Sequence, residues 1–135
     1  MTINAILDDG ATLSMLSARV AKLLDLSGPI RRLLIGGITG TKNSIDSAEV
    51  PVLLSSTVGT EVIPHTINVI DNPVGDLYPA NWNKLKHQFK HLEDIQFPDI
   101  DPSTPVEMVL GNDNPNLQER LRKISAATTR SQSLD

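Results

Sequence analysis

A glycine-rich stretch between two apolar arms limits most strongly how this chain can fold. Residues 30–45 read IRRLLIGGITGTKNSI, with three glycines within five residues. Glycine at that density between apolar and β-branched residues is typical of a β-hairpin with a pliable tip. Two longer strands are predicted after it, at 48–54 and 61–70, joined by a turn around Val58 and Gly59. This half of the chain is therefore predicted to be mainly β.

An acidic turn lies between two short apolar strands near the start of the chain. Residues 3–7 are predicted to be a strand that ends at Asp8-Asp9-Gly10, and residues 13–16 can return as a second strand. Glycine permits backbone conformations that are closed to other residues, which suits a tight turn. Taken alone, the two carboxylates are best explained as turn residues that bond their own backbone.

Two helices are predicted beside these strands. Ser17 is a plausible N-cap for a helix over 18–24 that has Val20, Leu23 and Leu24 on one face. Asn81 is a plausible N-cap for a second helix that runs to about Leu92. Its apolar stripe is expected to pack onto the sheet, and consists of Trp82, Leu85, Phe89 and Leu92.

The C-terminal part repeats the pattern of a strand followed by a glycine turn. Residues 106–110 are predicted to be an apolar strand that is closed by Gly111-Asn112-Asp113. A last helix is expected over 117–124, and the polar residues 125–135 are expected to be a disordered tail.

The overall composition excludes several classes of function. The 135 residues suffice for one domain, and a formal net charge of −4 argues against a nucleic-acid or membrane-surface partner. The chain has no cysteine, which excludes disulfides and thiolate zinc sites and fits a reducing compartment. Without an apolar run of about 18 residues or a signal-peptide pattern, the chain is expected to be soluble and cytoplasmic.

Three motifs in this order resemble the retropepsin-like aspartic peptidases. They are an apolar strand that runs into Asp-x-Gly-Ala at 8–11, Ile-Gly-Gly-Ile-x-Gly at 35–40, and apolar-apolar-Gly-x-Asp at 109–113. More narrowly, LDDGATLSMLSARVAKLLDL, the Trp-bearing helix and VEMVLGNDN resemble the peptidase domain of BEL/Pao-type retrotransposon polyproteins. The resemblance spans residues 3–117.

The resemblance implies a particular fold. It predicts a mainly β, retropepsin-like closed barrel with a glycine-rich flap hairpin, one short helix after the first strands, the inserted helix at 81–92 and a C-terminal helix. The domain would cover residues 1–124. Since only seven residues precede Asp8, its N-terminal strand is expected to be truncated relative to the family.

The resemblance also implies which residues form the site. Asp8 would be the catalytic acid, and Asp9, Gly10 and Ala11 would complete the active-site loop. Leu110 and Gly111 would form the second turn, and Asp113 would be structural. The flap that binds substrate through its backbone would consist of Ile35, Gly36, Gly37, Ile38, Thr39 and Gly40.

The function implied is that of an aspartic endopeptidase acting on its own polyprotein. In this class two carboxylates share one proton and activate a water molecule. Because each chain carries one such Asp, the resemblance implies a homodimer with an extended polypeptide substrate, and no cofactor, metal, nucleic acid or membrane. Asp9 stands where the family usually has Thr or Ser. The alternative is therefore an inactive domain that acts as a dimerisation or peptide-binding module.

Other chemistries are weaker interpretations of the same residues. His87 and His91 are four residues apart and could share a metal, but Gln88 stands where a zinc protease would have Glu. Asp99 and Asp101 resemble the start of a calcium loop that lacks its later glycine and glutamate. The glycine hairpin does not match a phosphate-binding loop.

Overall fold

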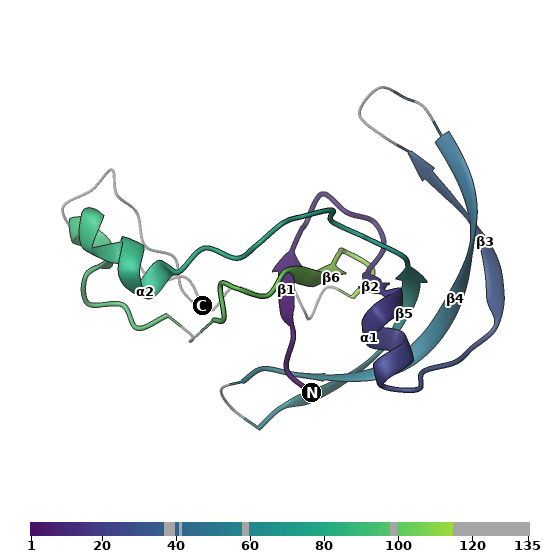
Figure 1. The fold of residues 1–135 in the computed structure, drawn as a ribbon, viewed down its shortest axis with the longest axis horizontal. Coiled ribbons are helices and arrows are strands. Elements are labelled where there is room, and N and C mark those ends of the chain that lie inside the picture. The colour runs from purple at the N-terminus through teal and green to yellow at the C-terminus, as the bar shows by residue number, and fades with distance from the viewer. Residues whose placement is uncertain (37–39, 41, 58–59, 98–99, 115–135) are drawn as a thin grey trace.

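The computed structural model describes residues 1–36, 40, 42–57, 60–97 and 100–114. Six strands form one mixed sheet in the order β1-β6-β2-β5-β4-β3 (Figure 1). The strands are β1 (Asn4–Leu7), β2 (Met15–Ser17), β3 (Ile30–Gly36), β4 (Lys42–Ser55), β5 (Val62–Ile70) and β6 (Val106–Leu110). The helical elements are α1 (Ala18–Leu23), α2 (Trp82–Leu85) and the 3-10 turns η1 (Lys86–Gln88) and η2 (Lys90–Leu92). The prediction of a mainly β chain is confirmed.

The sheet has two parts that differ in how their strands pair. Strands β3, β4 and β5 form an antiparallel meander, in which Leu33 lies opposite Ile45 and Val50 opposite Ile67. At the other edge, β6 is inserted between β1, to which it is parallel, and β2, to which it is antiparallel. This insertion brings the end of β6 beside the end of β1, although about a hundred residues separate them in the sequence.

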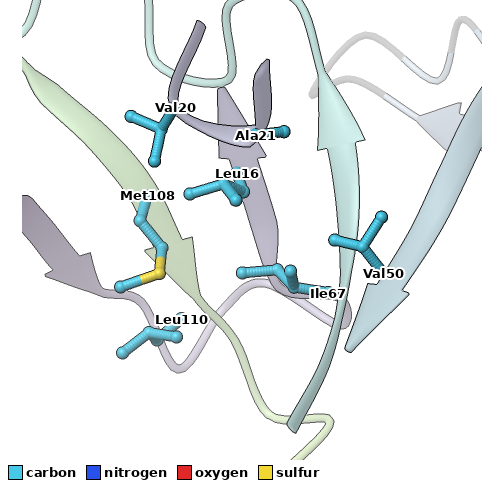
Figure 2. Packing of buried hydrophobic residues seen from close by; sticks show 7 residues of the cluster. All are labelled: Leu16, Val20, Ala21, Val50, Ile67, Met108 and Leu110. Atoms are coloured by element: carbon cyan, nitrogen blue, oxygen red, sulfur yellow. The ribbon is translucent and has the colours of Figure 1, made fainter. Parts of the chain in front are cut away.

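The core is small and aliphatic. Val20, Val50 and Ile67 are completely buried, and the cluster joins both parts of the sheet to α1 (Figure 2). Its remaining members are Leu16, Ala21, Met108 and Leu110. Every residue of β6 is buried, because this strand is flanked by β1 and β2. The core therefore fixes the position of β6, from which the second turn begins.

Helix α1 begins at the predicted residue, but the face that it buries is not the predicted one. The Ser17 hydroxyl accepts a hydrogen bond from the Val20 amide, as expected of an N-cap. The predicted face of Val20, Leu23 and Leu24 is only partly correct, because Val20 and Ala21 are buried whereas Leu23 is 60% exposed and Leu24 is exposed. The helix has only six residues, so it covers the core with fewer than two turns.

Two other predictions about architecture need correction. The closed barrel is not observed, because within the described residues β1 and β3 remain the two open edges of the sheet. Closure needs strands whose tilt and stagger bring the two edges together. Here the four-residue β1 pairs with β6 alone, and the β3–β4 hairpin extends away from it (Figure 1).

The helix predicted at 81–92 is broken. The Asn81 side chain accepts from the Lys84 amide as an N-cap, but the α-helix ends at Leu85 and Phe89 is extended, with φ −129° and ψ 105°. The aromatic stripe packs locally instead of onto the sheet: the ring centroids of Trp82 and Phe97 are 5.9 Å apart. Helix α2 and the β3–β4 hairpin lie on opposite sides of β1 (Figure 1).

Several predicted features lie outside the described residues. These are the turn at Val58 and Gly59, the helix at 117–124 and the tail at 125–135. Among the helices of the described part, none has the length and apolar character needed to cross a membrane.

Candidate functional site

The Asp8 turn follows directly from the end of β1. The Gly10 amide donates to Asp8 Oδ1 at 2.9 Å, and the Ala11 amide donates to the Asp8 carbonyl at 3.1 Å. These contacts make Asp8 the first residue of a tight turn that is closed by its own side chain. The residue is nevertheless exposed, so the carboxylate combines a fixed orientation with access to solvent.

The second turn lies directly against the first. The Asp8 amide donates to the Leu110 carbonyl at 2.9 Å, and the Asn112 amide donates to the Ala11 carbonyl at 2.8 Å. The Asn112 side chain also donates to the Asp9 carbonyl. We call residues 8–11 together with residues 110–113 the turn pair. Backbone bonds run across it in both directions, so the position of the Asp8 carboxylate depends on both turns.

Gly111 is required by the close contact within the turn pair. A Cβ atom at this position would lie 2.7 Å from the Ala11 carbonyl oxygen and 2.9 Å from that of Leu13. Both neighbours are backbone atoms, which cannot rotate away as a side chain can. Any larger residue would therefore force the two turns apart.

Ser14, a buried residue that the sequence analysis did not single out, bonds to both ends of the second turn. Asp113 accepts two hydrogen bonds from Ser14, one from its amide at 2.7 Å and one from its hydroxyl at 2.6 Å. The same hydroxyl accepts from the Gly111 amide at 3.1 Å. Asp113 was expected to be structural, but Ser14 was not singled out. The available signal was a small hydroxyl residue at the entry to β2.

The β3–β4 hairpin supplies the arms of the predicted flap. Its strands pair from Ile30 opposite Ala48 to Gly36 opposite Lys42. Ile35 is half-buried, and Gly40 has a φ of 79°, a value that favours glycine. Gly37, Ile38 and Thr39 lie outside the described residues. In Figure 1 the end of β3 and the end of β1 point toward the same side of the view.

A groove of about 1040 Å³ lies along β3, β4 and β5. Most of its lining is apolar. Two charged side chains of the lining, Arg31 and Glu49, form an ion pair with each other. Asp8 is not among the lining residues. Leu13, which lies close after the first turn, and Asp113, which belongs to the second turn, do line the groove. The other lining residues are Leu24, Leu26, Leu33, Pro51, Val52, Leu53, Pro64, His65, Thr66 and Asn68. The groove therefore leads away from the turn pair along the sheet.

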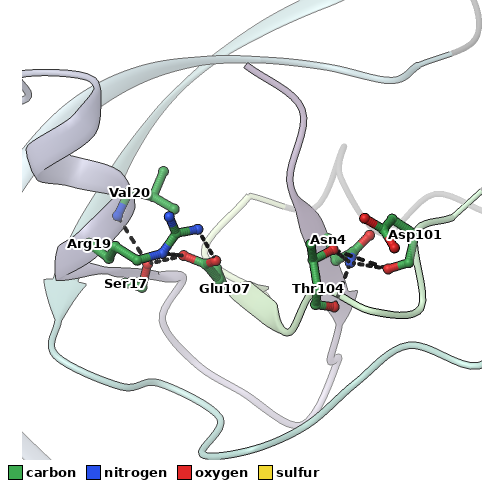
Figure 3. A network of polar contacts seen from close by, with 7 residues as sticks. All are labelled: Asn4, Ser17, Arg19, Val20, Asp101, Thr104 and Glu107. Atoms are coloured by element: carbon green, nitrogen blue, oxygen red, sulfur yellow. Dashed lines mark hydrogen bonds and ion pairs between the residues drawn. The ribbon is translucent and has the colours of Figure 1, made fainter.

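A second polar network joins β6 to β2 and α1. Glu107 is buried and accepts hydrogen bonds from the Ser17 hydroxyl and the Arg19 guanidinium (Figure 3). The hydrogen bond from Arg19 lowers the pKa of Glu107 below its usual value, with a smaller contribution in the same direction from Ser17. The Ser17 hydroxyl also caps α1, so this network ties the helix to β6.

A third network closes the loop before β6. The Asn4 side chain donates to the carbonyls of Asp101 and Thr104 (Figure 3). The Asp101 carboxylate accepts from the Ser103 side chain and amide, and both contacts lower its pKa. The acidic loop thus satisfies its own backbone, as a turn does. Asp99 lies outside the described residues.

The described residues contain no group of three or more acidic or histidine side chains placed to hold a metal ion. His91 instead packs edge-on against Phe89, with ring centroids 6.2 Å apart. No family model, no curated protein and no solved structure matches this chain.

Proposed function

We propose that this chain is a retropepsin-like aspartic peptidase domain that hydrolyses peptide bonds as a homodimer. The observation that carries the proposal is the turn pair, in which an exposed Asp8 is held by a hydrogen bond from its amide to the Leu110 carbonyl, and the Asn112 amide bonds back to the Ala11 carbonyl. An aspartic peptidase needs an acid of this kind, because its carboxylate must reach the substrate while its orientation stays fixed.

The surface next to Asp8 supports association with a second copy. Leu7 is 59% exposed, and Ile6 and Leu13 are also exposed. Ile6 and Leu7 directly precede Asp8 in the chain, and exposed apolar surface is typical of interaction sites. A two-fold axis close to Asp8 would cover these residues and bring the two Asp8 side chains together.

The proposed mechanism needs one acid from each chain. Two carboxylates about 3 Å apart share one proton, because both cannot carry a full charge at that distance. The ionised Asp8 would remove a proton from the attacking water molecule, and the protonated Asp8 would donate to the carbonyl oxygen of the substrate. No metal or cofactor takes part in this scheme.

The sheet offers a path for an extended substrate. The apolar groove runs along β3, β4 and β5 and begins at Leu13 and Asp113 beside the turn pair. A peptide bound there would place aliphatic side chains against the leucines and prolines of the groove. The β3–β4 hairpin would cover the substrate and exclude water during the reaction. A segment of the chain's own polyprotein is the proposed substrate.

The proposal is tested by replacing Asp8 with its neutral isostere. Asp8→Asn should lower the rate of cleavage of a peptide library at mildly acid pH by on the order of a thousandfold or more, since it removes a reacting group. Asp25→Asn is the matched control, because Asp25 is an exposed acid that follows α1. Cleavage that persists in Asp8→Asn would exclude Asp8 as the catalyst.

A second candidate is a non-catalytic domain that binds peptides or dimerises. Asp9 favours it, because a carboxylate beside Asp8 replaces the hydroxyl residue of the family and can donate a hydrogen bond only when protonated. Titration calorimetry with a statine-like transition-state mimic separates the two. Binding that depends on Asp8 supports the enzyme, whereas a dimer that neither binds the mimic nor cleaves peptide supports the module.

A further inference from the structure

The apolar groove along β3, β4 and β5 presents leucine side chains to the surface of the described chain. Leu24 and Leu53 are exposed, and Leu26 and Leu33 are half-buried. The groove volume of about 1040 Å³ slightly exceeds the range of about 300–1,000 Å³ that is usual for small-molecule sites. The groove therefore has room for several apolar side chains of a polypeptide segment.

A buried polar atom without a hydrogen bond belongs to the lining of the groove. The side chain of His65 is 8% exposed, and its Nε2 atom lies 3.3 Å from Asp113 Oδ1. This nitrogen nevertheless makes no hydrogen bond within the described part of the chain. A buried polar atom costs stability unless a partner satisfies it. A polypeptide segment in the groove can supply that partner from its backbone or from a polar side chain.

The described part of the chain ends beside this groove. Asp113 lines the groove, and Asn114 is the last described residue. Residues 115–135 follow and lie outside the described part. Because a chain advances by at most about 3.6 Å per residue, residue 117 lies within about 14 Å of Asp113. The residues after Asn114 therefore begin close to the groove.

The sequence after Asn114 fits an apolar groove. Leu117, Leu121 and Ile124 are spaced four and three residues apart, so they share one face of the helix predicted over 117–124. The positions between them are polar or charged. Such a helix buries its apolar face against another surface, since its isolated form is marginal at this length.

The charges of the segment and of the groove are opposite in sign. Residues 117–124 contain three basic side chains and one acidic one. The groove lining contains two acids, Glu49 and Asp113, and one base, Arg31. Opposite net charges favour the approach of the basic segment and disfavour an acidic one.

We propose that the groove is the docking site of residues 117–124 of the same chain. Leu117, Leu121 and Ile124 lie against the leucines of the groove, and a polar group of the segment satisfies His65. This docking does not depend on peptidase activity. Because a substrate peptide is proposed to bind in the same groove, the segment also competes with substrate, and this consequence alone rests on the proposed function.

Two leucine substitutions test the docking in the full chain. Leu121→Glu places a charge on the apolar face of the segment and should shift the backbone amide signals of Leu33, Val52 and Thr66, which line the groove. Leu134→Glu is the matched control, because it makes the same change outside the predicted helix, and it should leave these signals in place. Groove signals that do not move in Leu121→Glu would overturn the proposal.

A spin label locates the segment and remains decisive if the charged variant fails to fold. The chain has no cysteine, so Ser125→Cys creates a single site for a nitroxide label directly after the predicted helix. The label should broaden the same three groove amide signals, also when the labelled, isotope-enriched chain is diluted into an excess of native chain. The same label at Gln88→Cys, at an exposed position of η1, should leave them sharp. Sharp groove signals with the label at residue 125 would overturn the proposal. Broadening that disappears on dilution would also overturn it, because the segment would then occupy the groove of a second copy.

Discussion

Four acidic residues of this chain have four different surroundings, which determine what each can do. Asp8 is exposed at the end of a strand, Asp113 is clamped by Ser14, Glu107 is buried beside Arg19, and Asp101 closes its own loop. Within the turn pair, Asp113 binds Ser14 with both carboxylate oxygens, whereas the exposed Asp8 uses one oxygen to close its own turn. Residue type alone could not have separated them.

The contact at Gly111 gives a direct prediction for stability. Gly111→Ala should lower the free energy of unfolding by about 1–3 kcal/mol, because its Cβ would overlap the carbonyl oxygens of Ala11 and Leu13. Gly36→Ala is the matched control, since its Cβ would approach only the flexible Lys42 side chain, at 3.9 Å. Urea denaturation measures both, and equal loss in the two variants would refute the predicted clash.

Glu107 gives a prediction for pH. The hydrogen bond from Arg19 lowers its pKa, so the folded chain favours the ionised form more than the unfolded chain does. This stabilisation is complete above the ordinary glutamate pKa of about 4.3 and is lost as the pH falls through the lower pKa of the folded state.

Glu107→Gln should therefore unfold more easily at neutral pH, by about 1–2 kcal/mol, and the difference should shrink as the pH falls below about 4. The cost is modest because Arg19 is 62% exposed and can return to water. Urea denaturation over a pH series measures the effect. Glu93→Gln, at an exposed position, is the control, and a difference that is constant with pH would contradict the account.

At the scale of elements, the segment around α2 behaves as a closed unit. The Asn83 amide group donates to the Phe97 carbonyl at 2.8 Å and accepts from the Phe97 amide at 2.9 Å. The Lys86 ammonium donates to the Ile95 carbonyl at 2.7 Å. These bonds hold Phe97 beside Trp82, which explains why the aromatic stripe packs locally instead of onto the sheet.

Asn83→Ala should open this unit without unfolding the sheet. Trp82, the only tryptophan of the chain, is 40% exposed, and loss of both bonds to Phe97 should increase its exposure and shift its fluorescence emission to longer wavelength. Gln88→Ala, at an exposed position of η1, should leave the emission unchanged. An unaltered spectrum in Asn83→Ala would show that the two bonds do not hold the ring in place.

The sequence predicted helix caps and strands better than it predicted which residues contact one another across the fold. The caps Ser17 and Asn81 and the strand at 106–110 could be predicted because each depends on residues close in sequence. The contacts of Ser17 and Arg19 with Glu107 span about ninety residues, so no local pattern reveals them. The early end of α2 was missed for the same reason, since the Phe97 ring, which packs against Trp82, lies about fifteen residues further along the chain.

At the scale of the whole molecule, the sheet formed by the described residues has two open edges, and apolar residues remain exposed on its strands. Leu53 is 74% exposed on β4, and Leu7 and Leu34 are exposed on the edge strands β1 and β3. The closed barrel could not be predicted correctly, because closure depends on the tilt and length of every strand at once. The open edges and exposed leucines are consistent with the proposed association of two copies.

Subunit mixing tests directly whether two chains share one catalytic site. Asp8→Asn chains are added to a fixed amount of native chain under conditions where all chains associate, and peptide cleavage is measured. If each site needs Asp8 from two copies, an equal amount of variant should lower the rate to about half, because random pairing leaves that fraction of native pairs. A rate that does not change on mixing would show that a single chain suffices, and would contradict the proposed homodimeric mechanism.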